Sequence, residues 1–391
     1  MTECPVHTYS PHEYRPVGEW AAFYDGLRGE APVVRNTFAD GYYVLTRYED
    51  ILGAYQNTET FSTKAVTPFE PDPTYVWIPH MLGGTAHTQW RRQLGPDFSP
   101  RAVGALDDRI RAWAIELIDG IVDRGECDVI ADFSFHFPTT IFLELMGLPT
   151  SDLDQFMAWE ASILHSDGST PEEIQANREA GMAAVREYFR VVIADRRAQP
   201  RDDLISHALG FEIDGRPVTD DEAVSYCFFM FMAGLDTVAA AFGYALYHLA
   251  THPEDRERIV ADPSLIPAAM EEILRAYAFT VPARKLTRDV EVAGCPIPAG
   301  SMVSLPIRAA TRDENVFEDG TEVHIDRKPN NHIAFGAGPH RCLGMHLARH
   351  ELRIALEEWH KRIPEYRMAD GAVVREAGRS SGPDEVRLVW K

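Results

Sequence analysis

Apolar side chains recur every three or four positions along most of the chain after about residue 100, which is the spacing of amphipathic helices. The clearest stripe predicts a helix that stops near Gly125. This stripe consists of Leu106, Ile110, Trp113, Leu117 and Ile121. Further helices are predicted over 176–197, 219–251 and 266–277.

Strand-like sequence is confined to short segments. The pattern predicts strands over 42–45, 290–292 and 302–305, and Gly294 and Pro298 mark turns between the last two. The expected fold class is therefore mainly α with a small β-sheet lobe.

The run 219–251 is the longest apolar helix in the prediction. It opens on Thr219 and three acidic residues, which is a typical helix start. Its most apolar part nevertheless contains Asp236 and His248, so we interpret it as a buried core helix and expect no membrane span. Burying Asp236 costs free energy unless the carboxylate is paired or used, so we expect Asp236 to have a function.

Charge and cysteine content narrow the function classes. The 391-residue chain has a formal net charge of -22, which disfavours nucleic acid as a partner. The N-terminus lacks the basic and apolar segments of a signal peptide, so we expect a cytoplasmic protein. Five scattered cysteines include no C-x-x-C pair, which indicates a reducing compartment without a disulfide framework. They are Cys4, Cys127, Cys227, Cys295 and Cys342.

The segment 335–344 carries the most specific chemistry. Its glycines and proline predict a rigid loop that runs directly into a helix, with Cys342 at the junction. Helix N-terminal N–H groups favour a thiolate there, and a thiolate suits axial ligation of haem iron. Two other interpretations remain at this point. Cys342 is a buried structural cysteine in the first, and a zinc ligand with His340, His346 and His350 in the second.

Phe335, Gly336, Gly338, His340, Cys342 and Gly344 fill every fixed position of the pattern F-G-x-G-x-H-x-C-x-G, and the segment resembles the signature of cytochromes P450. Glu272 and Arg275 match the E-x-x-R pair of that family, which would lock a charge network under the loop. The resemblance implies one P450 domain over 1–391, with a β-rich lobe from the N-terminal part and about 280–310. It also implies haem b, held by the Cys342 thiolate between a long central helix and the cysteine-loop helix.

The resemblance assigns further roles. In the family, Thr237 would hydrogen-bond at the oxygen site and Asp236 would relay protons from solvent. The pattern H-T-x-x-R places His87 and Arg91 at the haem propionates, together with Arg284 and His340. Phe335, Gly336 and Gly344 would also contact the cofactor.

Electrons would have to come from other proteins, since the chain shows no flavin or nicotinamide domain. Arg91, Arg92, Arg341 and Arg349 would form a basic docking patch on the cysteine side of the haem. We expect an acidic iron-sulfur ferredoxin with its reductase as the donor, and a flavodoxin remains an alternative.

The proline-rich segment 68–79 predicts an irregular lid or pocket wall. It is similar to the lid of the camphor hydroxylase type, in which a tyrosine at the place of Tyr75 hydrogen-bonds a substrate ketone. This likeness indicates a compact terpenoid or cyclic ketone. The apolar wall is expected to contain Phe69, Trp77, Phe229, Ala233 and Val281.

Two departures leave other substrates open. Residues 83–86 replace the acidic and proline residues usual before His87, and Arg379 is an unexpected cation that could meet a carboxylate. A steroid or macrolide is the alternative substrate class. A haem- or zinc-binding sensor is the alternative without catalysis.

Overall fold

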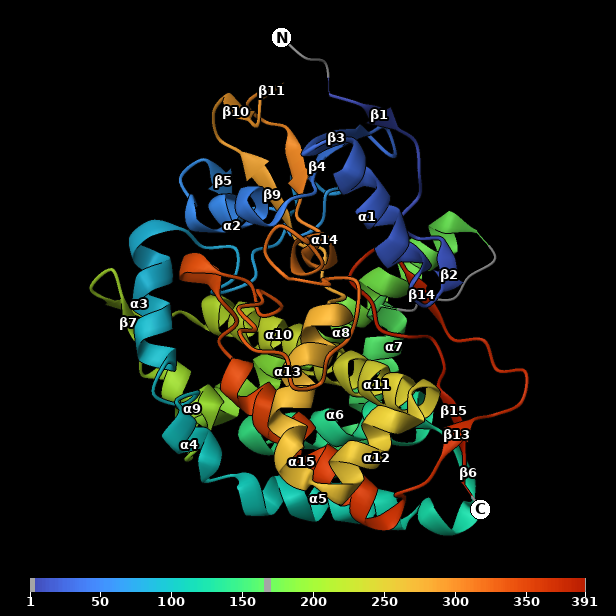
Figure 1. Ribbon diagram of the computed structural model, residues 1–391. Coiled ribbons are helices and arrows are strands. Elements are labelled where there is room, and N and C mark those ends of the chain that lie inside the picture. Colours follow the sequence, from blue (N-terminus) through green and yellow to red (C-terminus); the bar gives the residue numbers. More distant parts are fainter. Residues whose placement is uncertain (1–3, 165–169, 391) are drawn as a thin grey trace.

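The computed structural model describes residues 4–164 and 170–390. Helices fill the larger part of the molecule, and the main sheet lies at one end with α1 and α2 beside it (Figure 1). The helices are α1 Glu19–Glu30, α2 Tyr48–Gln56, α3 Gly84–Leu94, α4 Pro100–Gly104, α5 Asp107–Asp119, α6 His136–Leu145, α7 Leu153–Leu164, α8 Pro171–Ala198, α9 Leu204–Leu209, α10 Asp220–Gly234, α11 Asp236–Thr251, α12 Pro253–Ala261, α13 Ile266–Ala276, α14 Ile307–Thr311 and α15 Met345–Arg362.

The main sheet has six strands in the order β1-β3-β4-β12-β9-β5. Within it, β12 pairs parallel with β4 and antiparallel with β9, where Arg284 lies opposite Val303. The remaining strands form small two- and three-stranded sheets. The strands are β1 Val6–His7, β2 Tyr14–Pro16, β3 Val33–Asn36, β4 Tyr42–Leu45, β5 Phe61–Ser62, β6 Glu126–Asp128, β7 Glu212–Ile213, β8 Arg216–Pro217, β9 Ala283–Leu286, β10 Val290–Val292, β11 Cys295–Ile297, β12 Met302–Ser304, β13 Arg367–Met368, β14 Arg375–Ala377 and β15 Arg387–Val389.

The predicted elements are present with shifted ends. The strands at 42–45 and 290–292 are confirmed, and β12 ends one residue before the predicted limit. Helix α8 begins earlier than predicted, because the Thr170 side chain accepts a hydrogen bond from the Glu173 N–H at 3.2 Å and caps the helix. In α5 the buried stripe is Ile110, Ala114 and Ile118. Trp113 and Leu117 are only partly buried, so the predicted face was slightly rotated.

The long apolar run is not one continuous helix. Thr219 and Glu222 form a reciprocal capping box that starts α10 as predicted, but the helix is interrupted at Leu235. The combined run Asp220–Thr251 is long and apolar enough to cross a membrane, yet 56% of its most apolar window is buried inside the protein. The burial of this run agrees with the predicted core location, whereas the prediction of one continuous helix over 219–251 is wrong.

The interruption coincides with a boundary between two hydrophobic cores. Buried residues of α10, up to Leu235, pack with α6, α8 and α9. Buried residues of α11, from Val238 onward, pack with α5, α13 and α15. A third core lies under the main sheet. The two helices therefore join two separately packed halves of the helical region.

The expectation of unpaired cysteines is wrong for one pair. Cys4 and Cys295 form a disulfide, with their Cα atoms 5.8 Å apart and a sequence separation of 291. Scattered positions hid this pair, because the N-terminal segment returns to the β10–β11 hairpin only in the folded chain. Cys127 and Cys227 are buried thiols, and Cys342 is exposed.

A buried ion network connects α13 to the segment before the cysteine loop. Glu272 and Arg275 are both 0% exposed and make two hydrogen bonds of 2.8 Å with each other. Arg275 also donates to three backbone carbonyls, those of Thr311, Gly320 and Glu322. Glu272 accepts from the backbone of His324 and from the side chains of Arg327 and Asn330. The network thus holds an irregular segment in place.

Arg275→Ala is expected to lower the free energy of unfolding by about 3–5 kcal/mol, because it leaves the Glu272 carboxylate buried without its main partner. Chemical denaturation measures this change. The control is Arg190→Ala, which breaks an i,i+3 pair with Glu187 whose side chains are 57% and 68% exposed. Its expected cost is below about 1 kcal/mol, and equal losses for both variants would contradict the role of the network.

Candidate active site

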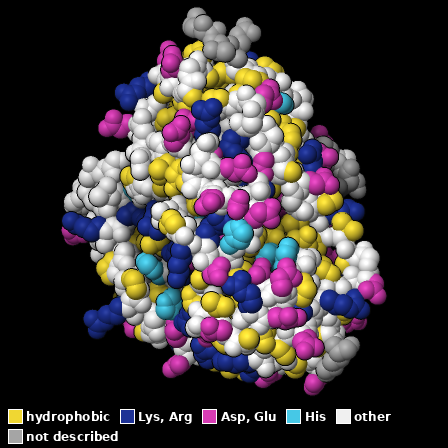
Figure 2. Space-filling view, in the orientation of Figure 1, with side chains coloured by type: hydrophobic (Ala, Val, Ile, Leu, Met, Phe, Trp, Pro, Cys, Tyr) yellow, Lys and Arg dark blue, Asp and Glu magenta, His cyan; other side chains and the backbone are white. Residues whose placement is uncertain are grey.

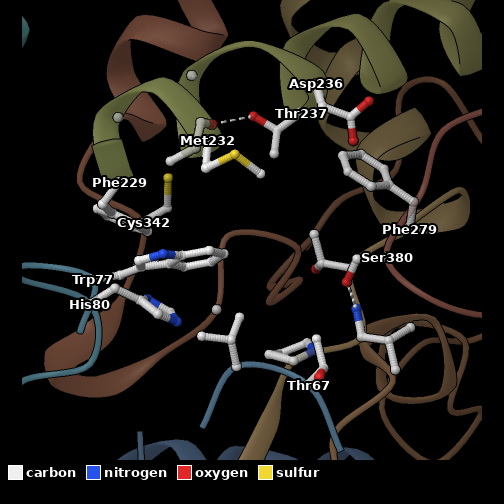
Figure 3. Close-up of a pocket in the computed structure, with 18 of the residues that line it drawn as sticks. Thr67, Trp77, His80, Phe229, Met232, Asp236, Thr237, Phe279, Cys342 and Ser380 are labelled. Atoms are coloured by element: carbon white, nitrogen blue, oxygen red, sulfur yellow. Dashed lines mark hydrogen bonds between the residues drawn. The ribbon is translucent and has the colours of Figure 1, made fainter. Parts of the chain in front are cut away.

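A cavity of about 1380 Å³ lies between the cysteine loop and the α10–α11 junction. Figure 3 shows Cys342 and Thr237 reaching into it from different elements, with Trp77, His80 and Phe229 on one side. The structure brings together around this cavity every residue predicted to touch cofactor, oxygen or substrate. These residues are Phe69, Tyr75, Trp77, His87, Arg91, Phe229, Ala233, Asp236, Thr237, Val281, Arg284, Phe335, Gly336, His340, Cys342 and Gly344.

The cysteine loop has the conformation that its glycines permit. Gly336 and Gly338 both have positive φ, 69° and 66°. A Cβ on Gly338 would also lie 2.5 Å from the Tyr55 carbonyl oxygen, so only glycine fits there. The Cys342 N–H donates to the Phe335 carbonyl at 2.8 Å, and α15 begins three residues later. The side chain of Cys342 is thereby directed into the cavity.

Burial and charge act against each other at the Cys342 thiol. The Cys342 side chain is exposed to the cavity but enclosed by the surrounding protein. This enclosure raises its pKa, whereas the Gly344 backbone N–H and the charges of Arg91, Arg349 and Arg341 lower it. A bound metal ion would favour the thiolate outright.

The zinc interpretation is not supported by this arrangement. His350 lies 2.6 Å from Asp107, and the His340 ring stacks on His87 with centroids 3.9 Å apart. Within residues 4–164 and 170–390 no group of three or more His, Cys, Asp or Glu side chains could hold a metal ion. The predicted zinc ligands are therefore dispersed among other partners.

Arg284 supplies the test of whether a haem fits. Its side chain is almost completely buried at 2% exposure, and its Nε makes no hydrogen bond with any described residue. The guanidinium group lies over the Tyr55 ring at 5.0 Å and donates only to the Ala283 carbonyl. A buried cation without a carboxylate partner is costly. A propionate at the cavity edge would provide that partner, so the donor set fits haem.

Three imidazoles lie beside Arg284 and Arg91. Burial, followed by the charge of neighbouring groups, lowers the pKa of His340 to about 2, of His87 to about 4 and of His80 to about 3. All three rings are therefore neutral at pH 7 in the structure as described. His340 and His87 retain N–H groups that can donate to a carboxylate. His80 was not predicted, although it directly follows the lid segment.

The oxygen side of the cavity is formed at the helix interruption. The Thr237 hydroxyl donates to the Ala233 carbonyl at 2.9 Å, within the turn where the helix is broken. Asp236 lies close to Glu160 of α7, which is 3% exposed and was not predicted. Burial, and then the charge of Asp236, raise the pKa of Glu160 well above its ordinary value. Glu160 is therefore a neutral acid beside the predicted proton relay.

An aromatic wall closes the side facing the lid. Tyr75 stacks on Trp77 at 5.3 Å between centroids, and Trp77 and His80 lie at 6.0 and 5.2 Å from Phe229. The Tyr75 hydroxyl donates to Glu70 at 2.7 Å, so a substrate ketone would have to replace Glu70 as its acceptor. The segment 68–79 has no helix or strand, as predicted.

Sequence reasoning missed other lining residues because each is unremarkable in its own segment. Thr67, Met232 and Phe279 line the cavity, as do Arg178 and Met182 of α8. Their positions follow from how distant segments meet, and no local motif marks them.

The predicted basic patch is present only in part. Arg91, Arg341 and Arg349 all lie close enough to Cys342 to affect its pKa, and Arg91 donates to the Arg341 carbonyl at 2.7 Å. Arg349, however, is paired with Glu271 at 2.6 Å. Figure 2 shows Lys and Arg side chains mixed with Asp and Glu on this face of the molecule. Its local charge is therefore less positive than the sequence indicated.

Comparisons with known proteins agree with this geometry. A family model described as "Cytochrome P450" matches residues 151–359. A probable cytochrome P450 127A1 from Sinorhizobium fredii is 35% identical over 90% of this chain and 84% of that protein. A steroid C26-monooxygenase from Mycolicibacterium smegmatis is 33% identical over 94% of this chain and 92% of that protein. The crystal structure of CYP101J2 superposes with a TM-score of 0.89 at 30% identity, covering 99% of this chain and 97% of the other.

Glu160→Gln is expected to change the pH dependence of stability. Glu160 is protonated in the folded protein, but in the unfolded chain it ionises above its ordinary pKa of 4.5. The wild-type protein should therefore lose stability as the pH rises through this range, by at most about 1.4 kcal/mol per pH unit. Chemical denaturation between about pH 5 and about pH 8 measures this, and parallel curves for wild type and variant would show that Glu160 is not buried as a neutral acid.

Proposed function

The chain belongs to the cytochrome P450 family, and from this premise we propose that it hydroxylates a hydrophobic substrate of terpenoid size, using dioxygen and electrons from a ferredoxin. Members of the family are monooxygenases that carry haem b bound through a cysteine thiolate. The observation that carries the proposal is the position of Cys342, which faces Thr237 and the aromatic wall across one largely apolar cavity.

Cys342 would hold the haem iron through its thiolate, and Phe335, Gly336 and Gly344 would contact the cofactor. A Cβ on Gly344 would meet no protein atom within 4 Å, which agrees with a flat group lying over this residue. The buried Arg284 would hold one propionate, with His87, Arg91 and His340 completing the polar edge. Bound haem supplies the activation of dioxygen, from which one oxygen atom enters the substrate.

The chain's own groups manage protons and water. The Thr237 hydroxyl, now donating to Ala233, can turn its proton toward the cavity at no cost in covalent geometry. Asp236 and the neutral carboxyl of Glu160 provide neighbouring proton sites behind Thr237. The wall of Tyr75, Trp77 and Phe229 restricts the access of water to this side.

Electron donation needs a separate protein at the cysteine face. Arg92 and Arg341 are exposed there, next to Arg91, and suit an acidic iron-sulfur ferredoxin served by its reductase. A flavodoxin is the alternative donor. The cytoplasmic location stays a prediction.

A steroid or macrolide is the second candidate substrate class. The cavity of about 1380 Å³ exceeds the usual range of about 300–1,000 Å³ for ligand pockets, although the haem takes a share of it. The relative from Mycolicibacterium smegmatis is named for a steroid reaction. A terpenoid ketone would need the Tyr75 hydroxyl to leave Glu70, whereas a larger body could fill the cavity without that exchange.

The first experiment is an optical titration of the purified ferric protein with terpenoid ketones, terpenoid alcohols and steroids. A Soret band that shifts to high spin with a compact ketone supports terpenoid hydroxylation, and a shift with steroids alone supports the second candidate. The control variant Cys342→Ser should lose the thiolate spectrum while keeping the fold. A protein without any Soret band after haem supply would contradict the proposed function.

Thr237→Ala is expected to uncouple turnover. Without the hydroxyl, protons reach the oxygen site less specifically, so product formed per reducing equivalent should fall by about tenfold or more while peroxide accumulates. Oxygen, peroxide and product are measured together with a ferredoxin system. The matched control is Thr251→Ala, at the far end of α11, which should leave coupling unchanged. Unchanged coupling in Thr237→Ala would remove Thr237 from this role.

A further inference from the structure

The outer end of the cavity contains a second pair of cations. Four segments contribute lining residues there, at 11–14, 67–75, 174–182 and 378–380. The Arg379 N–H donates to the Pro11 carbonyl at 3.0 Å, which fastens the last segment to the first. Both Arg178 of α8 and Arg379 line the cavity at this end.

Neither of these guanidinium groups has a carboxylate partner in the described part of the chain. No side-chain hydrogen bond or ion pair joins Arg178 or Arg379 to any described residue, and the Nε of Arg178 is buried as well. The acid of the adjoining loop, Glu70, accepts the Tyr75 hydroxyl at 2.7 Å. Two partly buried cations without a carboxylate in hydrogen-bond contact are costly.

The two cations lie near each other. Burial and then the charges of Arg379 and Arg178 lower the pKa of His12, which also lines this end. Burial and then Glu70 raise the pKa of Tyr75, and the charges of Arg178 and Arg186 oppose this rise. Both guanidinium groups therefore line the same cavity within electrostatic range of His12.

This pair is distinct from the cations assigned to the haem. The pKa of His340 is affected by Arg284 and Arg91, and that of His12 by Arg379 and Arg178, without a shared member. Arg284 is packed over Tyr55 on the main sheet, whereas Arg178 belongs to α8 and Arg379 to the loop after β14. The propionates therefore do not account for Arg178 and Arg379.

We propose that Arg178 and Arg379 bind the carboxylate of an amphiphilic substrate whose apolar body extends toward Thr237 and Cys342. Guanidinium groups bind carboxylates through two parallel charge-assisted hydrogen bonds. Ser380 adds a donor, because its Oγ accepts the Val281 N–H at 2.7 Å and its own proton remains available (Figure 3). Phe279, Val281 and Met182 line the apolar part.

The proposal rests on the monooxygenase function and makes it more specific. A substrate held by its carboxylate at the outer end exposes the opposite end of its carbon skeleton to the oxygen site. The preferred class is therefore a carboxylic acid with a terpenoid or linear hydrocarbon body, oxidised at a carbon remote from the acid group.

The test uses the haem-loaded protein and matched probes. Dodecanoic acid is compared with dodecanamide, and abietic acid with its primary amide, by the ligand dependence of the Soret shift. We expect one acid to bind about tenfold to a hundredfold more tightly than its amide, which is the range of a charge-assisted hydrogen bond. The double variant Arg178→Gln/Arg379→Gln should lose this preference and bind the amide as before.

The control variant is Arg186→Gln, on the same helix but directed at the Phe228 ring and not lining the cavity. It should keep the preference for the acid. If the double variant does not fold, Arg379→Lys keeps the charge without the paired donors, and a reduced preference is expected there.

Two results distinguish failure of the proposed carboxylate site from failure of the proposed monooxygenase function. Equal binding of acid and amide by the wild-type protein, or an unchanged preference in the double variant, would overturn the carboxylate site while uncharged ligands still shift the Soret band. Absence of the thiolate spectrum itself would overturn the proposed function. Product analysis adds a second criterion, since hydroxylation next to the carboxyl carbon contradicts the orientation.

Discussion

The buried pair of Glu272 and Arg275 is the interaction on which the cysteine side of the molecule depends. The chain between α14 and the cysteine loop has almost no regular structure, so its backbone groups need partners from elsewhere. Arg275 donates to two of its carbonyls and to the Thr311 carbonyl at the end of α14, and Glu272 accepts from its N–H and side-chain donors at 2.9–3.1 Å. Because neither charge is accessible to water, removing one leaves the other buried without its main partner. The position of Cys342 thus depends on a network that has no contact with the cavity.

Charge also organises the cavity along its length. Cations without carboxylate partners among the described residues lie at both ends, with Arg284 at the inner end and Arg178 and Arg379 at the outer end. The walls between them are aromatic and aliphatic. Near Thr237, burial raises the pKa of Glu160, so this acid adds no negative charge to the cavity. A molecule that fits this distribution is apolar in its middle and anionic at one end. The same physical rule explains both ends, since each buried cation requires an anion that the described chain does not provide.

Local sequence predicted the parts that local geometry determines. The cysteine loop was predictable because Gly338 must accept a positive φ against the Tyr55 carbonyl, and the capping box of α10 because Thr219 and Glu222 satisfy each other. The interruption at Leu235 was not, since nothing in its own side chain opposes a helix. Sequence reasoning missed three features for a common reason, namely that each depends on residues far away in the sequence. They are Arg178 in the cavity wall, Glu160 beside Asp236, and the disulfide of Cys4 with Cys295.

The interruption at Leu235 has a mechanical consequence. Phe229 and Ala233 belong to α10, which is packed against the same core as α8. Asp236 and Thr237 begin α11, which is anchored in the other core with α15. The substrate wall and the hydroxyl of Thr237 are therefore held by two different hydrophobic cores, which meet where that hydroxyl donates to the Ala233 carbonyl. Repacking of the core around α8 would therefore alter the proposed substrate wall more directly than it alters the position of the Thr237 hydroxyl.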